Sequence, residues 1–286
     1  MIFINSRGFY PNDRSDLLSL IEYSFLNKKY GPGYIPKEIK KEKDIISGIV
    51  PHSNYNYLLP NSINLYKDIY ENFNFDTLVI IGPNHSNLGI SLSLLLDDWY
   101  TSIGTLKTDI LFGRKLINSF DIYEDPLPFK YEHSVQVNLP IIRYLFNDIK
   151  ILTILVKKID IDKAQQFAKV LKEISEELGR KIFVLFTGNL LHHGPEYSYI
   201  KYEKNITENI KDEDNYYINK IINLDSNFIY KNTNSLVFCG KYPFIIFIEY
   251  NKLFDRKFDL YSHISSSEIN GSEINVVDYF SLLSYK

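Results

Sequence analysis

Short runs of aliphatic and β-branched residues alternate along the chain with longer stretches in which apolar residues recur at helical spacing. The four clearest strand-like runs are Ile45–Val50, Leu78–Ile81, Ile151–Val156 and Ile182–Thr187. The helical stretches are Asp16–Leu26, Ile63–Asn72, Val135–Phe146 and Ile161–Leu178. The last of them is framed by Asp160 as a suitable N-cap and Gly179 as a suitable C-cap residue. Strands that alternate with helices predict a layered α/β fold.

The last third of the chain predicts a mobile loop, two helices and a closing pair of strands. The acidic, Asn-rich stretch Lys204–Asn215 is predicted to be an exposed, mobile loop. The predicted helices are Tyr216–Leu224 and Phe244–Phe254, and the predicted strands are Phe258–Tyr261 and Ile274–Ser284, with a polar loop at Ser265–Ser272. Two such strands would pair antiparallel, so we expect a mixed sheet. A single domain over residues 1–286 is the simplest interpretation.

The composition is ordinary for a soluble globular protein and argues against nucleic acid or a membrane as a partner. Of 286 residues, 45% are hydrophobic and 23% are charged, and the net charge is −3. Basic residues are dispersed apart from the sign-alternating run Lys37–Lys43, so we expect no nucleic-acid partner. Apolar runs are too short for a signal peptide or a membrane span, and Phe244–Tyr250 contains Glu249. A single cysteine excludes an intramolecular disulfide and fits a reducing compartment, which predicts a cytoplasmic protein.

Histidines follow three of the four strand-like runs. His52 comes directly after the first run, His85 follows the second, and the pair His192 and His193 follows the fourth. In α/β sheets ligands bind outside the carboxyl ends of the strands, so parallel neighbours would bring these histidines to one rim. A single histidine after a strand is more often a turn residue bonded to a carbonyl. Three equivalent positions favour a site, whereas His263 near the C-terminus receives no role.

Two further positions carry chemistry. Cys239 precedes a predicted helix, with Pro243 suited to its first turn and Gly240 able to turn the chain sharply. A thiol at a helix N-terminus has a stabilised thiolate, but free cysteine is commonly a buried small hydrophobe, and spacing alone favours that interpretation. The pair Glu132 and His133 suits general acid–base chemistry, or a helix N-terminus where a carboxylate complements the dipole.

Taken in order, short segments along the whole chain resemble the Memo family. The segments are RGFYP at Arg7–Pro11, GIVPHSNY at Gly48–Tyr55, IIGPNH at Ile80–His85, Trp99–Asp109, EHSVQVNLP at Glu132–Pro140, GNLLH at Gly188–His192, FCGKYP at Phe238–Pro243 and Tyr261–Tyr279. The ordered set is far more specific than any single motif in it.

The resemblance implies a three-layer α/β/α sandwich with a central mixed sheet, similar to class III non-haem iron extradiol dioxygenases. It also implies a pocket in which two histidines and a cysteine hold iron or copper. Carried over by motif, the metal ligands would be His52, His85 and Cys239, with His192 as a possible acid–base residue. Two imidazoles and a thiolate would suit zinc as well. A chain of this length needs no metal to fold, so a metal would be functional.

The remaining pocket residues also follow from the resemblance. Residues expected to line the pocket or support its ligands are Phe9, Tyr55, Asn189, Glu132 and His133. Asn189 stands where the family usually has Asp, which puts proton-transfer chemistry in doubt. Asn54 replaces a usual Gly, and Asn tolerates left-handed backbone better than most residues.

Three functions remain open at this point. The first is a metal-dependent redox enzyme. The second is a module that binds a small molecule or peptide in the old dioxygenase cleft. The third is a thiol hydrolase, which would need Cys239 within hydrogen-bond reach of His52, His85 or His192. The resemblance further implies radical-SAM and AMMECR-type proteins as pathway partners.

Overall fold

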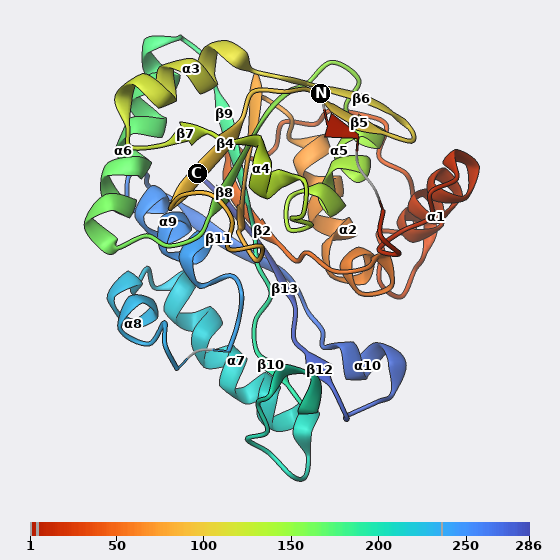
Figure 1. Cartoon of the computed structure of the whole chain (residues 1–286). Helices are drawn as coiled ribbons and strands as arrows, with labels where there is room; N and C mark the ends of the chain where they lie inside the picture. Colours follow the sequence, from red (N-terminus) through yellow and green to blue (C-terminus); the bar gives the residue numbers. More distant parts are fainter. Residues whose placement is uncertain (1, 4–5, 236) are drawn as a thin grey trace.

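A central sheet organises the chain in the computed structural model, which describes residues 2–3, 6–235 and 237–286 (Figure 1). Among these residues the sheet has eleven strands. In spatial order its main path is β1 (Ile2–Phe3), β5 (Trp99–Thr101), β6 (Gly104–Thr108), β8 (Lys150–Val156), β3 (Thr77–Pro83), β9 (Ile182–Thr187), β2 (Ile45–Val50), β13 (Phe280–Tyr285) and β11 (Lys257–His263). Strand β4 (Leu92–Leu95) also pairs with β8, and β7 (Tyr123–Glu124) pairs with β4.

Helices cover both faces of this sheet, so the predicted three-layer α/β/α arrangement with a mixed sheet is confirmed. On one side lie α3 (Ile110–Ser119), α6 (Ile161–Glu177) and α9 (Lys241–Asn251), and on the other α1 (Arg14–Leu26), α2 (Tyr55–Glu71) and α5 (Leu139–Leu145) (Figure 1). The remaining elements of the described chain are α4 (Pro126–Phe129), the 3₁₀ turns η1 (Gln136–Asn138) and η2 (Pro195–Tyr197), the long helix α7 (Ile206–Ile222), α8 (Ser226–Lys231), α10 (Ser266–Asn270), and the paired β10 (His192–His193) and β12 (Val276–Val277).

The four central strands are the ones that the apolar runs predict, and all are parallel. β8 pairs with β3, β3 with β9, and β9 with β2. β2, β3 and β9 are buried at every position, which is why their sequences are continuous apolar runs rather than alternating ones. Because the strands are parallel neighbours, their carboxyl ends meet at one edge of the sheet. The predicted convergence of the turns that carry the histidines is therefore confirmed.

The closing strands pair as predicted, since β11 and β13 are antiparallel and β13 continues onto β2. The predicted mobile loop at Lys204–Asn215 is wrong, because most of it lies in helix α7. Its apolar stripe is hard to see in the sequence because a buried carboxylic residue, Asp214, occupies one of the inward positions. The polar stretch Ser265–Ser272 likewise contains a short helix, α10, begun by a capping box at Ser265.

Two expectations about backbone conformation are also wrong. Asn54 has φ −64° rather than a left-handed conformation, and it serves as the N-cap of α2 by accepting a hydrogen bond from the Asn56 amide. Gly240 has an ordinary helical φ of −73°, so a sharp turn is not what requires glycine there.

None of the helices in the described parts of the chain is both long and apolar enough to cross a membrane.

Candidate metal centre

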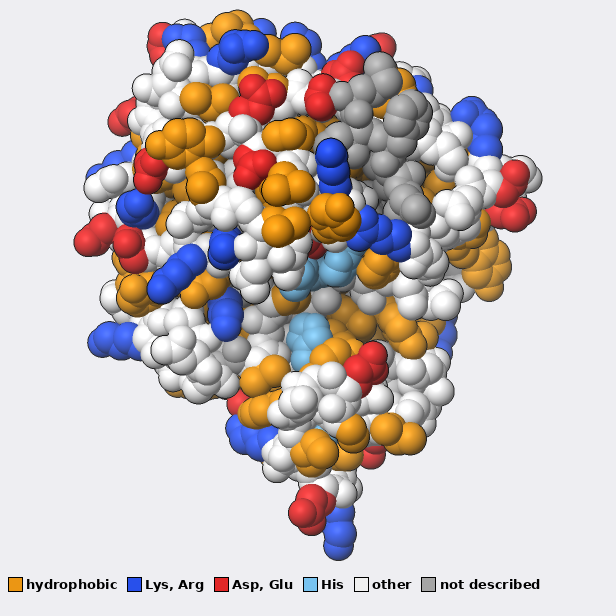
Figure 2. Space-filling model, in the orientation of Figure 1, with side chains coloured by type: hydrophobic (Ala, Val, Ile, Leu, Met, Phe, Trp, Pro, Cys, Tyr) orange, Lys and Arg blue, Asp and Glu red, His pale blue; other side chains and the backbone are white. Residues whose placement is uncertain are grey.

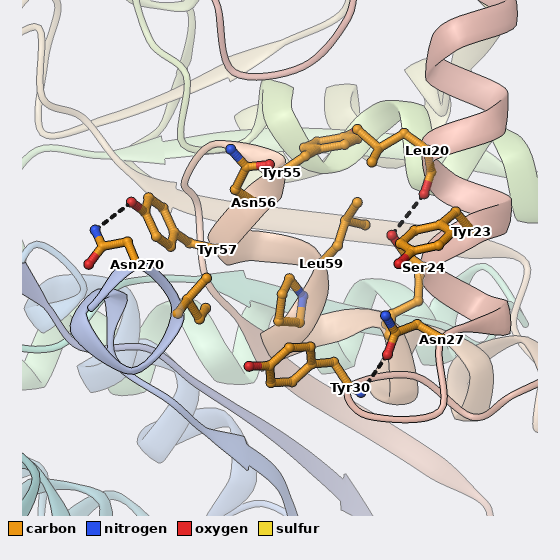
Figure 3. A pocket seen from close by; sticks show the side chains of 13 residues that line it. Leu20, Tyr23, Ser24, Asn27, Tyr30, Tyr55, Asn56, Tyr57, Leu59 and Asn270 are labelled. Carbon is orange, nitrogen blue, oxygen red and sulfur yellow. Dashed lines mark hydrogen bonds between the residues drawn. The ribbon is translucent and has the colours of Figure 1, made fainter. Parts of the chain in front are cut away.

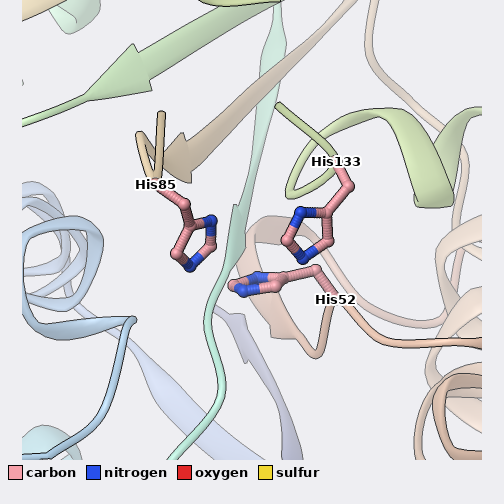
Figure 4. A group of neighbouring side chains, drawn as sticks. All are labelled: His52, His85 and His133. Carbon is pink, nitrogen blue, oxygen red and sulfur yellow. The ribbon is translucent and has the colours of Figure 1, made fainter. Parts of the chain in front are cut away.

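Three imidazoles meet at the edge of the sheet where the parallel strands end. His52 lies just after β2, His85 just after β3, and His133 in the loop before η1. One nitrogen from each ring lies within 4.8 Å of the other two (Figure 4). The His85 and His133 rings are stacked with centroids 5.0 Å apart, and the His52 ring stands edge-on to both at 5.1 and 5.4 Å. This spacing is suitable for a single metal ion.

Glu132 holds two of these histidines in place. Its fully buried carboxylate accepts hydrogen bonds from Nδ1 of His85 at 2.9 Å and from the backbone amides of His133 and Ser134, each at 2.9 Å. The His85 amide also donates to it. Because Nδ1 of His85 is occupied by the carboxylate, Nε2 is the nitrogen available to a ligand, as in carboxylate–histidine–metal arrangements.

The Glu132 carboxyl group and the His85 imidazole shift each other's pKa in opposite directions. Burial would raise the pKa of Glu132, but the hydrogen bond and charge of His85 outweigh it and lower the pKa to about 2. Burial would lower the pKa of His85, but hydrogen bonds with Cys239 and Glu132 outweigh it and raise the pKa to about 10. The neighbouring Cys239 and Glu132 thus favour the protonated form of His85.

The other two imidazoles are neutral at pH 7. Burial lowers the pKa of His52 well below its usual range, and the charges of His85 and His133 act in the same direction. Burial likewise lowers the pKa of His133 to about 4. Phe9, expected to line the pocket, stacks on the His133 ring with centroids 4.7 Å apart. Neutral imidazoles are the form that binds metal.

Cys239 lies beside the histidines at the start of α9. Its Sγ is 3.1 Å from Nε2 of His52 and 3.3 Å from the amide nitrogen of Asn189, which donates to it. Two glycines permit this approach, because a Cβ on Gly188 would lie 2.6 Å from Cα of Gly240. Gly240 is thus needed for space, where the turn after β9 meets the turn before α9.

Asn189 ties these two turns to His52. Its Oδ1 accepts a hydrogen bond from the His52 amide at 3.0 Å, and its Nδ2 donates to the His52 carbonyl at 3.2 Å. An ionised aspartate has no donor for that carbonyl. The amide at position 189 therefore has a structural function that the resemblance alone did not reveal.

His192 lines a cavity of about 460 Å³ together with His85 and Cys239. Its Nδ1 lies 2.8 Å from the Leu190 carbonyl, which can only accept a hydrogen bond. The proton of the neutral ring is therefore on Nδ1, and Nε2 is unprotonated. Burial lowers the pKa of His192 to about 4, despite the hydrogen bonds with backbone at Leu190 and Val237. Figure 2 shows histidine side chains in a hollow near the centre of the visible face, with Lys and Arg side chains nearby.

Tyr55 has a different setting. Its hydroxyl donates to the Val137 carbonyl at 3.0 Å, and its ring packs on Tyr10. It also lines a separate cavity of about 420 Å³ between α1, α2 and α10, whose described lining residues are tyrosines, amides, a serine and aliphatic side chains without a histidine (Figure 3).

The geometry brings His133 into the same cluster as His52 and His85, whereas sequence reasoning placed it only among the residues lining the pocket. His133 follows no strand, so the argument from strand ends could not identify it. The available signal was the adjacent Glu132, whose carboxylate binds His85 across the turn. His263, to which no role was given, lies 2.5 Å from Oδ2 of Asp278 through its Nε2.

Comparison with known proteins adds three findings. The model of a family described as Memo-like protein matches residues 7–283. MEMO1 family proteins from Methanococcus vannielii and Desulfurococcus amylolyticus are 30% and 31% identical over 284 and 283 residues, covering 96% and 97% of this chain and 96% of each relative. The crystal structure of an uncharacterized protein from Escherichia coli K12 is similar in fold, with a TM-score of 0.53 at 9% identity, over 84% of this chain and 99% of that one.

Proposed function

The chain belongs to the Memo family, and we propose that it binds one transition-metal ion between His52, His85 and His133, with Cys239 as a further donor. The observation that carries this proposal is the convergence of three imidazole nitrogens within 4.8 Å, two of them on neutral rings. The carboxylate of Glu132 orients His85 with its Nε2 available, which is the usual support for a metal-binding histidine.

The donor set suits iron or copper, and zinc as well. Imidazole nitrogen binds all three metals, and a thiolate favours copper(I) and zinc. Cys239 lies 3.1 Å from Nε2 of His52, so its sulfur and that nitrogen can approach one ion together. His52 and His85 belong to both possible ligand sets, whereas Cys239 and His133 are the positions that a test must separate.

We further propose that the metal serves a redox reaction on a small molecule bound in the cavity of about 460 Å³. A bound iron or copper ion would supply one-electron chemistry and Lewis acidity at that cavity. His192 lines the same space as a neutral imidazole, so its Nε2 can accept a hydrogen bond from a ligand. Its pKa of about 4 makes it a weak proton acceptor at neutral pH.

The test is anaerobic loading of the purified protein with Fe(II) or Cu(I), followed by metal analysis and calorimetric titration. We expect one ion per chain in the wild type and none in His85→Ala. Glu132→Gln should keep the site but weaken it about 10- to 100-fold, the usual effect of losing an orienting partner. His192→Ala should retain the full metal content and so serves as the control. Failure of the wild type to retain stoichiometric metal would refute the proposal.

Two variants separate the ligand sets. His133→Ala and Cys239→Ser are loaded in the same way, and the melting temperature of each metal-free protein shows whether it is folded. Loss of affinity in both variants supports a four-donor site. Loss in Cys239→Ser alone would restrict the site to His52, His85 and Cys239, and loss in His133→Ala alone would restrict it to the three histidines.

One observation favours a second function, that of a thiol hydrolase. Cys239 is within hydrogen-bond reach of His52, and Nδ1 of His52 lies 3.3 Å from the Thr187 hydroxyl, which can orient the ring. Against it, burial disfavours the imidazolium that a thiolate–imidazolium pair requires, since the pKa of His52 is well below its usual range. Alkylation of Cys239 at neutral pH much faster than a free thiol, and unchanged by metal removal, would favour this function instead.

The expected peptide ligand and the radical-SAM and AMMECR-type partners stay predictions. So does the cytoplasmic location.

A further inference from the structure

Two buried carboxyl groups lie behind the loop that carries His192. Asp214 projects from α7, and Asp278 lies between β12 and β13. Both are completely buried, and neither belongs to the histidine cluster. Buried carboxyl groups are rare unless a partner compensates for the loss of water, so a pair of them needs an explanation.

Both residues form hydrogen bonds with the backbone of Leu190 and Leu191. Oδ2 of Asp214 accepts a hydrogen bond from the Leu191 amide at 3.1 Å. The backbone of Asp278 donates to the Leu191 carbonyl at 3.0 Å and accepts from the Leu190 amide at 3.0 Å. These three bonds fix the chain directly before His192. Only one of these bonds involves a carboxyl group, that of Asp214, because the two bonds at position 278 are made by the backbone. The carboxyl group of Asp214 is therefore the side chain that holds the backbone before His192.

If both carboxyl groups are ionised, one of their buried oxygens has no hydrogen-bond donor among the described residues. Asp278 accepts a hydrogen bond from the Tyr279 amide at 3.1 Å, and its Oδ2 lies 2.5 Å from Nε2 of His263. Oδ1 of Asp214, in contrast, is buried and has no donor among the described residues. A proton on Asp214 would turn its carboxyl group into a donor toward the neighbouring carboxylate of Asp278.

The surrounding charges agree with one proton on the pair. Burial, and next the charge of Asp278, raises the pKa of Asp214 well above its usual range. From α7, Glu213 also faces the pair, but it is bound to Lys201 at 2.8 Å. From β11, His263 reaches Asp278 through Nε2, while its Nδ1 lies 3.1 Å from Oδ1 of Asn215. Two buried like charges in contact are strongly disfavoured, and one shared proton removes the repulsion.

We propose that Asp214 and Asp278 share a single proton, and that the carboxyl group of Asp214, through its bond to the Leu191 amide, holds the chain before His192 in place at the cavity. Asp214 is a positioning residue, which acts through the backbone of Leu191, and Asp278 is the partner with which it shares the proton. The inference goes beyond the proposed function and needs no bound metal, so it stands or fails independently of metal binding.

Infrared difference spectroscopy tests for the proton directly. At neutral pH the wild type should show a carboxylic-acid carbonyl band that shifts in heavy water. The band should disappear in Asp214→Asn and persist in Asp212→Asn, a matched control at an exposed position of the same helix. Absence of the band from the wild type, or its persistence in Asp214→Asn, would overturn the proposal.

Hydrogen exchange of the Leu191 amide tests the positioning. Asp214→Ala removes the acceptor, so the amide should exchange at least about tenfold faster than in the wild type, as expected for the loss of one buried hydrogen bond. Asp214→Asn should restore slow exchange, because its amide oxygen accepts from Leu191 and its NH₂ donates to Asp278. Equal protection in all three proteins would show that the pair does not hold the loop. If Asp214→Ala does not fold, the comparison of Asp214→Asn with the wild type by infrared spectroscopy still decides the shared proton.

Discussion

Replacing Asn189 by Asp, the residue that the resemblance leads us to expect there, tests whether the amide is needed to fix His52. In the wild type, Oδ1 of Asn189 accepts from the His52 amide at 3.0 Å, and Nδ2 of Asn189 donates to the His52 carbonyl at 3.2 Å. The substitution keeps the acceptor but removes the donor. Both groups are buried, so the carbonyl loses its partner and faces an oxygen instead. Leaving one buried polar group unpaired costs about 1–3 kcal/mol.

The stability lost in Asn189→Asp should depend on pH, whereas a loss caused by poorer packing would not. Burial and the nearby carbonyl raise the folded-state pKa of an introduced carboxyl group, so its protonated form is favoured in the folded protein. The stability of Asn189→Asp is then highest below about pH 4, the unfolded-state pKa, and is lost as the pH rises through the folded-state value. Asn189→Ala removes both hydrogen bonds without a charge, and its deficit should be the same at every pH.

Thermal unfolding followed by circular dichroism measures both effects. For a chain of this size, about 1–3 kcal/mol corresponds to a melting temperature lower by about 2–6 °C. We expect this decrease at neutral pH and a smaller one near pH 5. The reasoning is refuted if Asn189→Asp melts with the wild type at neutral pH, or if its deficit has the same pH dependence as that of Asn189→Ala.

Two further predictions concern the turn before α9 and the buried acid pair. Gly240→Ala would place a Cβ 2.3 Å from the Phe244 ring and 2.9 Å from Cα of Gly188. We therefore expect the free energy of unfolding to fall by about 1–3 kcal/mol, measured by thermal melting, and metal binding through Cys239 to weaken. Unchanged stability would contradict the close packing. Because the pKa of Asp214 is raised in the folded state, the stability due to its proton is complete below about pH 4 and decreases as the pH rises. The wild-type melting temperature should therefore fall relative to Asp214→Asn between about pH 5 and pH 8, and parallel pH profiles would contradict the raised pKa.

The sequence predicts the central strands well because their apolar runs are continuous. β2 and β9 have the bounds that the runs Ile45–Val50 and Ile182–Thr187 predict. Burial on both faces makes these runs continuous and is typical of parallel strands, so the pattern predicts that their histidines can meet at one rim. The strand order itself, with β9 between β2 and β3, does not follow from the pattern. By contrast, the sequence predicts only the second half of α7 as a helix, at Tyr216–Leu224. The first half has the pattern of a loop because its buried side includes Asp214, whose partner is Asp278 and not a residue of its own helix.

Cys239 shows which part of the site no local pattern can reveal. Its contact with His52 joins residues 187 positions apart, and nothing in the spacing of the two predicts it. The contact requires Gly188 and Gly240 to pack face to face, and each glycine is individually ordinary in the sequence. Only the order of β2, β9 and their neighbours makes that approach possible. The resemblance could therefore name Cys239, whereas the residues alone could not.

The polar supports of the cluster show why an amide and a carboxylate are not interchangeable at position 189. Glu132 and Asn189 touch the histidines through different atoms: the carboxylate orients a ring nitrogen of His85, and the amide fixes the backbone of His52. A ring nitrogen needs an acceptor, whereas a backbone amide and carbonyl together need one acceptor and one donor. Asn meets the second requirement without adding a negative charge to the pocket. An Asp there would have to be protonated to do the same, so an ionised Asp at position 189 would add a negative charge to the pocket and leave the His52 carbonyl without its donor.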